Sequence, residues 1–348
     1  MYLPCLQIFS LMGFGRRTAV WEPIQAGTSP SRQALQPLPT PRSILPPGHT
    51  PNKLTRGRRR PRRPPSIAPY IPAPAHPLRH PDSTRFMYSK CTGKRRAVCI
   101  GINYRGQKHE LRGCVNDAKH CFNFLVRRVG YHPHNVVLLT DDSPHGRSQP
   151  TRRNILDAMK WLVSDARPHD ALFFQYSGHG GQTPDLDGDE VDGYDEVIYP
   201  LDFKRAGHIT DDEMHAIMVR PLPTGCRLTA VFDSCHSGTA LDLPYIYNHR
   251  GRLKGRHVSA QARARNATSA DVVSLSACKD GQTSADTFAD GVAVGAASHA
   301  LIKVLEMYPN QSYRELMHSL RVSLRPRYTQ TPQLGSSHPI DTSLRFIL

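Results

Sequence analysis

The sequence predicts an α/β protein in which a mostly parallel central sheet is flanked by helices and preceded by a disordered extension. Three observations support this prediction. Short apolar runs, typical of buried strands, alternate with segments of helical periodicity from residue 94 onward. The chain has 348 residues, 39% of them hydrophobic, which suffices for one large domain. Proline and arginine are concentrated before residue 90.

The extension is set apart by its composition. Residues 1–90 hold 17 of the 30 prolines and 14 of the 45 lysines and arginines, but only two acids, Glu22 and Asp82. They therefore carry +12 of the formal net charge of +16. Such a segment buries too little apolar area to offset its ordering entropy, so we expect it to be disordered and partly polyproline II.

Basic residues cluster at 56–63, where a solvated tail, a nuclear-import signal and a patch for nucleic acid or an acidic partner are alternative interpretations. No aromatic residues interleave with these arginines, which argues against single-strand nucleic-acid binding. A strong salt dependence of binding by residues 1–90 would instead support a nucleic-acid module. At the N-terminus the apolar residues 1–15 precede Arg16 and Arg17, whereas a secretory signal places its positive charge first. No apolar run approaches the roughly 20 residues of a membrane span. We expect a cytoplasmic protein, with nuclear import as an alternative, and leave open whether residues 1–20 are a targeting segment.

The elements follow one another in the order that an α/β sheet requires. Apolar runs predict strands, and Asn103 ends the first of them; the runs are 96–102, 135–140, 171–176, 226–232 and 271–276. Helical periodicity predicts helices between and after them, at 113–129, from Thr151 to Val163, at about 295–307 and at 312–324. Thr151 is a capping residue, and Ser312 with Glu315 forms a capping box.

Two of these strands end in unusual loops. Residues 177–181 read Ser-Gly-His-Gly-Gly, and residues 233–238 read Asp-Ser-Cys-His-Ser-Gly. In parallel sheets the active site forms beyond the carboxyl ends of the strands, so His179 and Cys235 could meet there as an imidazole–thiolate pair. Small residues let the backbone turn, and Gly180 could help to hold an oxyanion. Either residue alone is more often structural, but two such loops together favour a catalytic pair.

These motifs resemble the two catalytic motifs of type I metacaspases, which are relatives of caspases in fungi, plants and protists. The resemblance extends over about residues 88–348, through the segments 91–104, 111–118, 241–245, 279–286 and 332–339, and is greatest to fungal members. His179 precedes Cys235 by 56 residues, close to the spacing of about 50 in caspases. A true caspase would carry Gln-Ala-Cys at the nucleophile, which is absent here.

The resemblance implies a caspase-like three-layer sandwich and a zymogen organisation. Residues 1–88 would be a disordered prodomain and 89–348 the peptidase domain. Within it, a large-subunit-like part of about 89–250 and a small-subunit-like part of about 258–348 would be joined by a basic linker at 247–257. Members of the family usually act as monomers.

Acidic residues near the nucleophile predict the substrate preference. Asp233 lies two residues before Cys235, where a carboxylate would attract Lys or Arg. The resemblance places Cys114, Asp117, Ser177 and Asp233 in the pocket for such a side chain, which argues against cleavage after Asp. The alternative for Asp117 is an acid that stabilises a helix N-terminus.

A second acidic region, residues 185–196, invites a calcium interpretation but fails the EF-hand pattern, because Glu190 stands where glycine is required. On spacing alone it is a solvated loop. The resemblance implies Ca²⁺ activation, with ligands that match Asp195, Asp211, Asp212 and Asp242.

The basic linker is either a solvated loop or an autoprocessing site, and the resemblance favours cleavage after Arg252 or Lys254. His236 is a poor candidate for the base because consecutive residues point in different directions, and Cys278 lacks a glycine turn and a partner histidine.

The sequence thus predicts a Ca²⁺-dependent cysteine endopeptidase that cleaves protein or peptide substrates after Arg or Lys. The alternative is a non-proteolytic scaffold or proteostasis factor with the same fold. Programmed cell death, stress response and protein quality control all remain open as its role.

Overall fold

The computed structural model describes residues 73–74, 77–79, 85–186, 188, 193–234, 240–254, 266–276, 286–289, 292–325 and 331–348, with no side chains described at 286–289 and 292–296. The Pro/Arg-rich segment before residue 73 lies outside these ranges, so its disorder stays a prediction. No helix of the described ranges is both long and apolar enough to cross a membrane.

A seven-stranded sheet with the order β10-β14-β11-β9-β5-β3-β4 forms the centre of the fold. Five strands run parallel: β3 (Arg95–Gly101), β4 (Val136–Thr140), β5 (Ala171–Ser177), β9 (Arg227–Asp233) and β11 (Asp271–Ser276). At one edge β14 (Gln333–Ser336) pairs antiparallel with β11, and β10 (Tyr245–Tyr247) pairs antiparallel with β14. The parallel core confirms the prediction, and the antiparallel edge adds to it.

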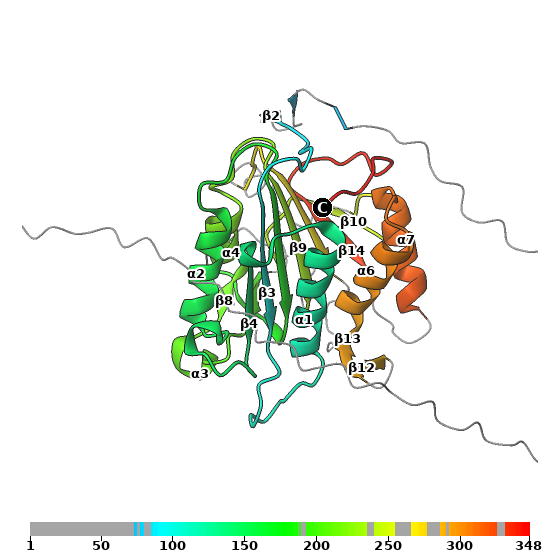
Figure 1. The fold of residues 1–348 in the computed structure, drawn as a ribbon. Helices are drawn as coiled ribbons and strands as arrows, with labels where there is room; N and C mark the ends of the chain where they lie inside the picture. Colours follow the sequence, from blue (N-terminus) through cyan, green and yellow to red (C-terminus); the bar gives the residue numbers. More distant parts are fainter. Residues whose placement is uncertain are drawn as a thin grey trace, which may run out of the picture. The chain divides into compact units, whose positions relative to one another are not determined.

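Helices cover both faces of this sheet, as Figure 1 shows. On one face lie α1 (Cys114–Phe124), α6 (Ala296–Met307) and α7 (Tyr313–Leu324), and on the other lie α2 (Arg152–Val163) and α4 (Asp211–Met218). Residues spaced by helical turns pack into one apolar core; they include Ala118, Cys121, Leu301, Val304, Leu316 and Leu320. The fold is therefore the three-layer caspase-like α/β arrangement that the sequence predicted.

All five predicted strands and all four predicted helices are present, and their ends are shifted by at most a residue or two in all but one. The exception is the helix predicted at 113–129, where α1 ends at Phe124 and continues as a short π-helix at Leu125–Val129. The side chain of Thr151 accepts a hydrogen bond from the Asn154 amide, and Ser312 and Glu315 form the predicted capping box. These local signals are strong because a capped helix start satisfies backbone donors that would otherwise be left without partners.

The elements that the sequence did not predict are short or polar. They are the three-stranded sheet β6 (Gly180–Pro184), β7 (Tyr194–Ile198) and β8 (Ile209–Thr210), the hairpin β12 (Asp286–Ala289) with β13 (Val292–Gly295), the pair β1 (Leu78–Arg79) with β2 (Arg85–Phe86), the edge strands β10 and β14, helix α4, the short α3 (Phe203–Ala206), and 3₁₀ turns at Pro133–Asn135 and Gly146–Ser148.

A buried polar cluster closes the amino ends of β9 and β11. The Arg227 guanidinium lies 3.1 Å from Asp271 Oδ1, and His338 Nε2 lies 3.1 Å from the same oxygen. Arg227 also donates to the Tyr313 hydroxyl on α7. Because an isolated charge in a protein interior is costly, this cluster holds two strands, a helix and the C-terminal segment in one arrangement.

The packed body begins a few residues before the predicted boundary at residue 88. The Phe86 ring stacks on His338 at 3.9 Å between centroids, and the Tyr88 hydroxyl donates to the Pro339 carbonyl at 3.3 Å. The Ser89 amide donates to Asp271 Oδ2 at 2.8 Å. The chain entering the domain is thus held against residues 338–341.

Candidate active site

The predicted pocket residues Ser177 and Asp233 lie side by side at the carboxyl ends of β5 and β9, where they are register partners. Both are buried. The Ser177 hydroxyl accepts from Gln175 Nε2 at 2.7 Å and lies 3.3 Å from the Ser298 hydroxyl. The amide of Ser298, in the first turn of α6, donates to Asp233 Oδ2 at 2.8 Å. Ser298 was not predicted, because no sequence signal places the start of α6 against β9.

Cys114 and Asp117, the other two predicted pocket residues, lie in the first turn of α1 and are buried. Helix α1 packs on β3, β5 and α6, and the last two of these elements carry Ser177 and Ser298. A Cβ atom at Gly101, the last residue of β3, would lie 2.2 Å from the Cys114 carbonyl oxygen. Glycine is therefore required where α1 begins, because the helix approaches the strand this closely.

His179 lies two residues beyond the end of β5 and has a defined imidazole orientation. Its Nε2 lies 2.6 Å from the peptide oxygen of His109. Because a carbonyl oxygen can only accept, this contact assigns a proton to Nε2, and in the neutral ring Nδ1 is then the proton acceptor. The structure thus leaves one nitrogen of His179 suited to act as a base, and His109 supplies a positioning group that the sequence did not reveal.

The predicted nucleophile Cys235 lies outside the described residues, as do His236 and Cys278. The described chain reaches Ser234, one residue past the end of β9. The described cysteines are 91, 99, 114, 121 and 226, all buried and none of them in a disulfide. Burial raises the pKa of the Cys91 thiol and raises that of Cys226 to about 12, which makes these two thiols poor nucleophiles.

Gly180, predicted to contribute to an oxyanion site, is the first residue of β6 and pairs with Ile198 of β7. The same short sheet carries the end of the acidic region, since Asp195 and Glu196 lie on β7. The loop residues 187 and 189–192 lie outside the described residues.

Three of the four predicted calcium ligands, Asp195, Asp211 and Asp212, lie at or beside the N-terminus of α4. Asp211 and Asp212 open this helix, Asp195 lies on the neighbouring strand β7, and Asp242 is buried with a φ of 48°. Leu241 contacts α4 through its carbonyl, 2.9 Å from His215 Nδ1. Burial and the adjacent carboxylate of Glu196 raise the pKa of Asp211 to about 9. Within the described residues no three carboxylate, histidine or cysteine side chains converge as a metal site.

The linker residues Arg252 and Lys254 lie in a hairpin that follows β10. The amides of Arg250 and Arg252 both donate to Asn248 Oδ1, at 2.8 and 3.2 Å. Leu253, between the two predicted cleavage sites, is 55% exposed and bridges to Tyr247. Lys254 donates to Gln333 on β14. Residues 255–265 of the linker region lie outside the described residues.

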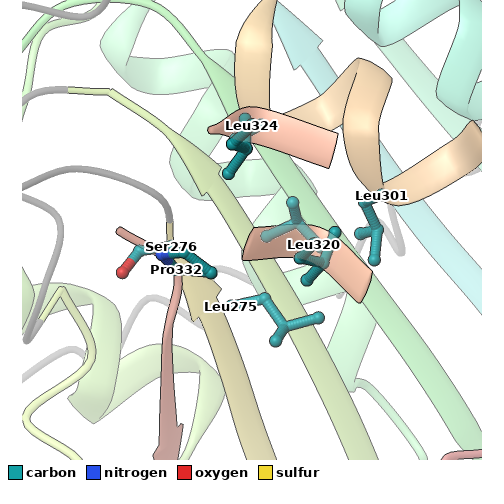
Figure 2. A pocket seen from close by; sticks show the side chains of 8 residues that line it. Leu275, Ser276, Leu301, Leu320, Leu324 and Pro332 are labelled. Carbon is teal, nitrogen blue, oxygen red and sulfur yellow. The ribbon is translucent and has the colours of Figure 1, made fainter. Parts of the chain in front are cut away.

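An apolar pocket lies between α6, α7 and the carboxyl ends of β9 and β11, as Figure 2 shows. Its lining includes Val231, Leu275, Leu320 and Leu324 and contains no charged side chain. The pocket therefore does not suit a Lys or Arg side chain. The buried carboxylates of Asp117 and Asp233 remain the better candidates for binding such a side chain.

Comparison with known proteins agrees with this arrangement. The family model "Metacaspase, peptidase C14 domain" matches residues 95–244. The chain is similar to Metacaspase-1 of Cryptococcus neoformans (53% identity, covering 75% of this chain and 66% of the relative). It is also similar to Metacaspase-1B of Aspergillus fumigatus (50% identity, 82% and 80% covered). A solved structure of the Geobacter sulfurreducens protein GSU0716 superposes with a TM-score of 0.52 at 25% identity, covering 73% of this chain and 98% of that one.

The parallel sheet, with a histidine loop after β5 and a cysteine-containing segment after β9, defines a caspase-like cysteine peptidase domain. The identities of about 50% show which one: the chain belongs to the metacaspase family, with the fungal type I members. It spans about two thirds of the length of the Cryptococcus relative.

Proposed function

We propose that this protein is a Ca²⁺-dependent cysteine endopeptidase that cleaves after Arg or Lys. The orientation of His179 carries the proposal. Because Nε2–H donates to the His109 carbonyl, Nδ1 is the ring nitrogen that can accept a proton. The imidazole is carried by the loop that follows β5. Strand β9 is the neighbour of β5 and leads through Ser234 to Cys235. A thiol and an imidazole at adjacent strand ends are the pair that acyl transfer needs.

In the proposed reaction, His179 Nδ1 takes the proton from the Cys235 thiol as its sulfur attacks the scissile carbonyl carbon. The amide of Gly180 donates to the resulting oxyanion. The protonated imidazole then gives its proton to the leaving amine, and the peptide bond breaks to leave an acyl-enzyme. A water molecule, deprotonated by His179, attacks the thioester and releases the new carboxylate together with the free thiol.

The preference for a basic side chain is supported by the buried acids at the strand ends. Asp233 and Asp117 are 6% and 1% exposed, and a buried carboxylate is stabilised by an opposite charge. An Arg side chain entering between β5, β9 and α1 would supply that charge, whereas an Asp side chain would add to the repulsion.

The donor chemistry near α4 supports a calcium requirement. Asp195, Asp211, Asp212 and Asp242 offer the carboxylate oxygens that Ca²⁺ prefers, and they would hold the ion. In the described structure the carboxyl group of Asp211 interacts with that of Glu196. Because no third ligand converges with them there, Ca²⁺ binding would have to bring further carboxylates close to this pair. The ion would offset repulsion among these carboxylates and fix the ends of β7 and α4 relative to the 241–243 segment.

Autoprocessing in the hairpin after β10 completes the proposal. Arg252 is exposed and Leu253 follows it at 55% exposure, so the bond after Arg252 is accessible. Processing in the wild type, but not in an Arg252→Ala, Lys254→Ala double variant, would support this assignment. Cleavage of the double variant at the same place would rule it out.

The test of the function uses a fluorogenic peptide ending in Arg, with and without millimolar Ca²⁺, and a matched peptide ending in Asp. We expect cleavage of the Arg peptide only with Ca²⁺ and only when Cys235 is intact, with Cys235→Ala as the control. If the folded wild type cleaves neither peptide under any condition, the protein is better described as a non-proteolytic scaffold.

A further inference from the structure

The hydroxyl groups of two buried tyrosines form hydrogen bonds with the backbone of His179. Neither tyrosine takes part in the reaction described above. Tyr104 follows β3 and Tyr176 belongs to β5, and both are at most 1% exposed. We infer that Tyr104 and Tyr176 are positioning residues for the His179 imidazole, an inference that rests on the proposed role of His179 as the base.

The contacts of the two hydroxyls reach both backbone groups of His179. The His179 amide donates to Tyr104 Oη at 3.1 Å, and Tyr176 Oη donates to the His179 carbonyl at 2.8 Å. The two hydroxyl oxygens lie 3.0 Å apart. Both are also within reach of the Tyr199 carbonyl, Tyr104 at 2.5 Å and Tyr176 at 3.2 Å. The backbone that carries the imidazole is thus bonded at its N–H and at its C=O.

Counting protons separates the roles of the two hydroxyls, because each has one hydrogen to donate. The shortest carbonyl contacts assign the Tyr104 proton to Tyr199 and the Tyr176 proton to His179. The Tyr104 oxygen is then the acceptor for the His179 amide. The His179 carbonyl, in contrast, also accepts from the Tyr199 amide at 3.2 Å. Loss of the Tyr104 hydroxyl should therefore disturb His179 more than loss of the Tyr176 hydroxyl.

The Tyr104 ring and the His109 carbonyl restrain the imidazole itself. The rings of Tyr104 and His179 lie 4.5 Å apart between centroids, and His109, from the same loop, accepts from Nε2. This loop is closed by bonds from the Leu111 amide to the Asn103 carbonyl and from the Gln107 amide to the Tyr104 carbonyl, at 2.7 and 2.9 Å. One short loop thus contacts two sides of the ring.

The backbone of Tyr104 adopts a conformation that L-residues avoid, with a φ of 53°. Such a conformation is unfavourable for a bulky residue and persists only where the surroundings enforce it. Here it brings the ring against His179 and the hydroxyl to the His179 amide. The strain is thus located where it serves the geometry of the base.

The test compares Tyr104→Phe and Tyr176→Phe with Tyr131→Phe. Tyr131 is an equally buried tyrosine whose hydroxyl donates to Ala171, at the opposite end of β5. Leaving the His179 amide without its acceptor should lower kcat for the Arg peptide by about tenfold to a hundredfold in Tyr104→Phe, with a smaller loss in Tyr176→Phe. KM should stay within about twofold, and the acid limb of the pH–rate profile should shift. Tyr131→Phe should keep kcat within about twofold and leave the pH profile in place.

A second readout is independent of peptidase activity. In protein labelled with ¹⁵N-histidine, the ring nitrogens of His179, assigned with a His179→Asn variant, should report an Nε2–H tautomer in the wild type. We expect a tautomer mixture in Tyr104→Phe, and the wild-type signal in Tyr131→Phe. The tautomer signals test the inference even if no peptide is cleaved. If Tyr104→Phe does not fold, the same signals are measured in Tyr176→Phe and compared with those of Tyr131→Phe. Signals and pH profiles identical in all folded variants would overturn it.

Discussion

At the scale of single residues, the glycine before the candidate base is required for space. The sequence suggested that small residues around His179 let the backbone turn. Gly178 does not have a positive φ, so a turn does not require it. A Cβ atom there would lie 2.6 Å from Tyr176 Oη and 3.0 Å from Tyr104 Oη. Glycine is needed because two buried hydroxyls occupy the volume that a side chain would take.

Replacing Gly178 with Ala should therefore destabilise the protein. Tyr176 and Tyr104 are buried and cannot swing away, so the added methyl group should lower the free energy of unfolding by ~1–3 kcal/mol. Urea unfolding followed by fluorescence measures this change. The matched control is Gly146→Ala, since a Cβ at Gly146 meets nothing within 4 Å and its φ is not positive. Equal stability of the two variants would contradict the explanation.

At the scale of elements, the buried Arg227–Asp271–His338 cluster joins β9, β11 and the C-terminal segment. Burial disfavours the charged form of Asp271, but the Arg227 guanidinium and His338 outweigh it and hold the pKa of that carboxyl below its usual 3.8. A lowered carboxyl pKa stabilises the folded state above pH 3.8, and the contribution is lost as the pH falls through the lower folded-state value.

Asp271→Asn should leave Arg227 buried without a counter-charge and lower the free energy of unfolding at pH 7 by ~3–5 kcal/mol. Its stability should also vary less with pH between about 5 and 3 than that of the wild type. Urea unfolding across this range measures both effects. As a control, Asp157→Asn alters an exposed pair with Arg153 at 3.9 Å, for which we expect ~0.5 kcal/mol or less. A comparable loss in both variants would contradict the role of the cluster.

The five central strands and four long helices were predictable because each has a local cause, either a continuous apolar run or a cap with an amphipathic face. Strands β6, β10 and β14 were not, since Gly-Gly-Gln-Thr-Pro and other short segments form strands only through their partners. The same distinction holds for the site. His179 and Asp233 were predictable from strand-end loops, whereas His109 and Ser298 act through tertiary contacts of their backbones, which no residue pattern records.

At the scale of the whole molecule, the segment that enters the domain is part of its core. Phe86 and Tyr88 are 3% and 6% exposed and lie against His338. A chain beginning at residue 73 retains these contacts, and a chain beginning at residue 89 loses both rings. The boundary at residue 88 that the resemblance implies would thus remove part of the packing.

We expect the chain that begins at residue 89 to unfold at a lower temperature than the chain that begins at residue 73. Losing a buried Phe side chain costs ~3–5 kcal/mol, and the Tyr88 contacts add to this. Calorimetry of the two chains measures the difference, and Phe86→Ala in the full chain should reproduce most of it. Equal melting temperatures would show that the 85–88 segment does not contribute to stability.

The order of the strands at the sheet edge also bears on what a cut in the linker would do. The last strand of the chain, β14, is inserted between β10, which precedes the hairpin at 248–254, and β11, which follows it. A chain severed after Arg252 or Lys254 would keep β10 of one piece paired with β14 of the other, and β14 paired with β11. The two polypeptides would then form a non-covalent heterodimer derived from a single gene product, migrating together in native buffer and separating only in denaturant.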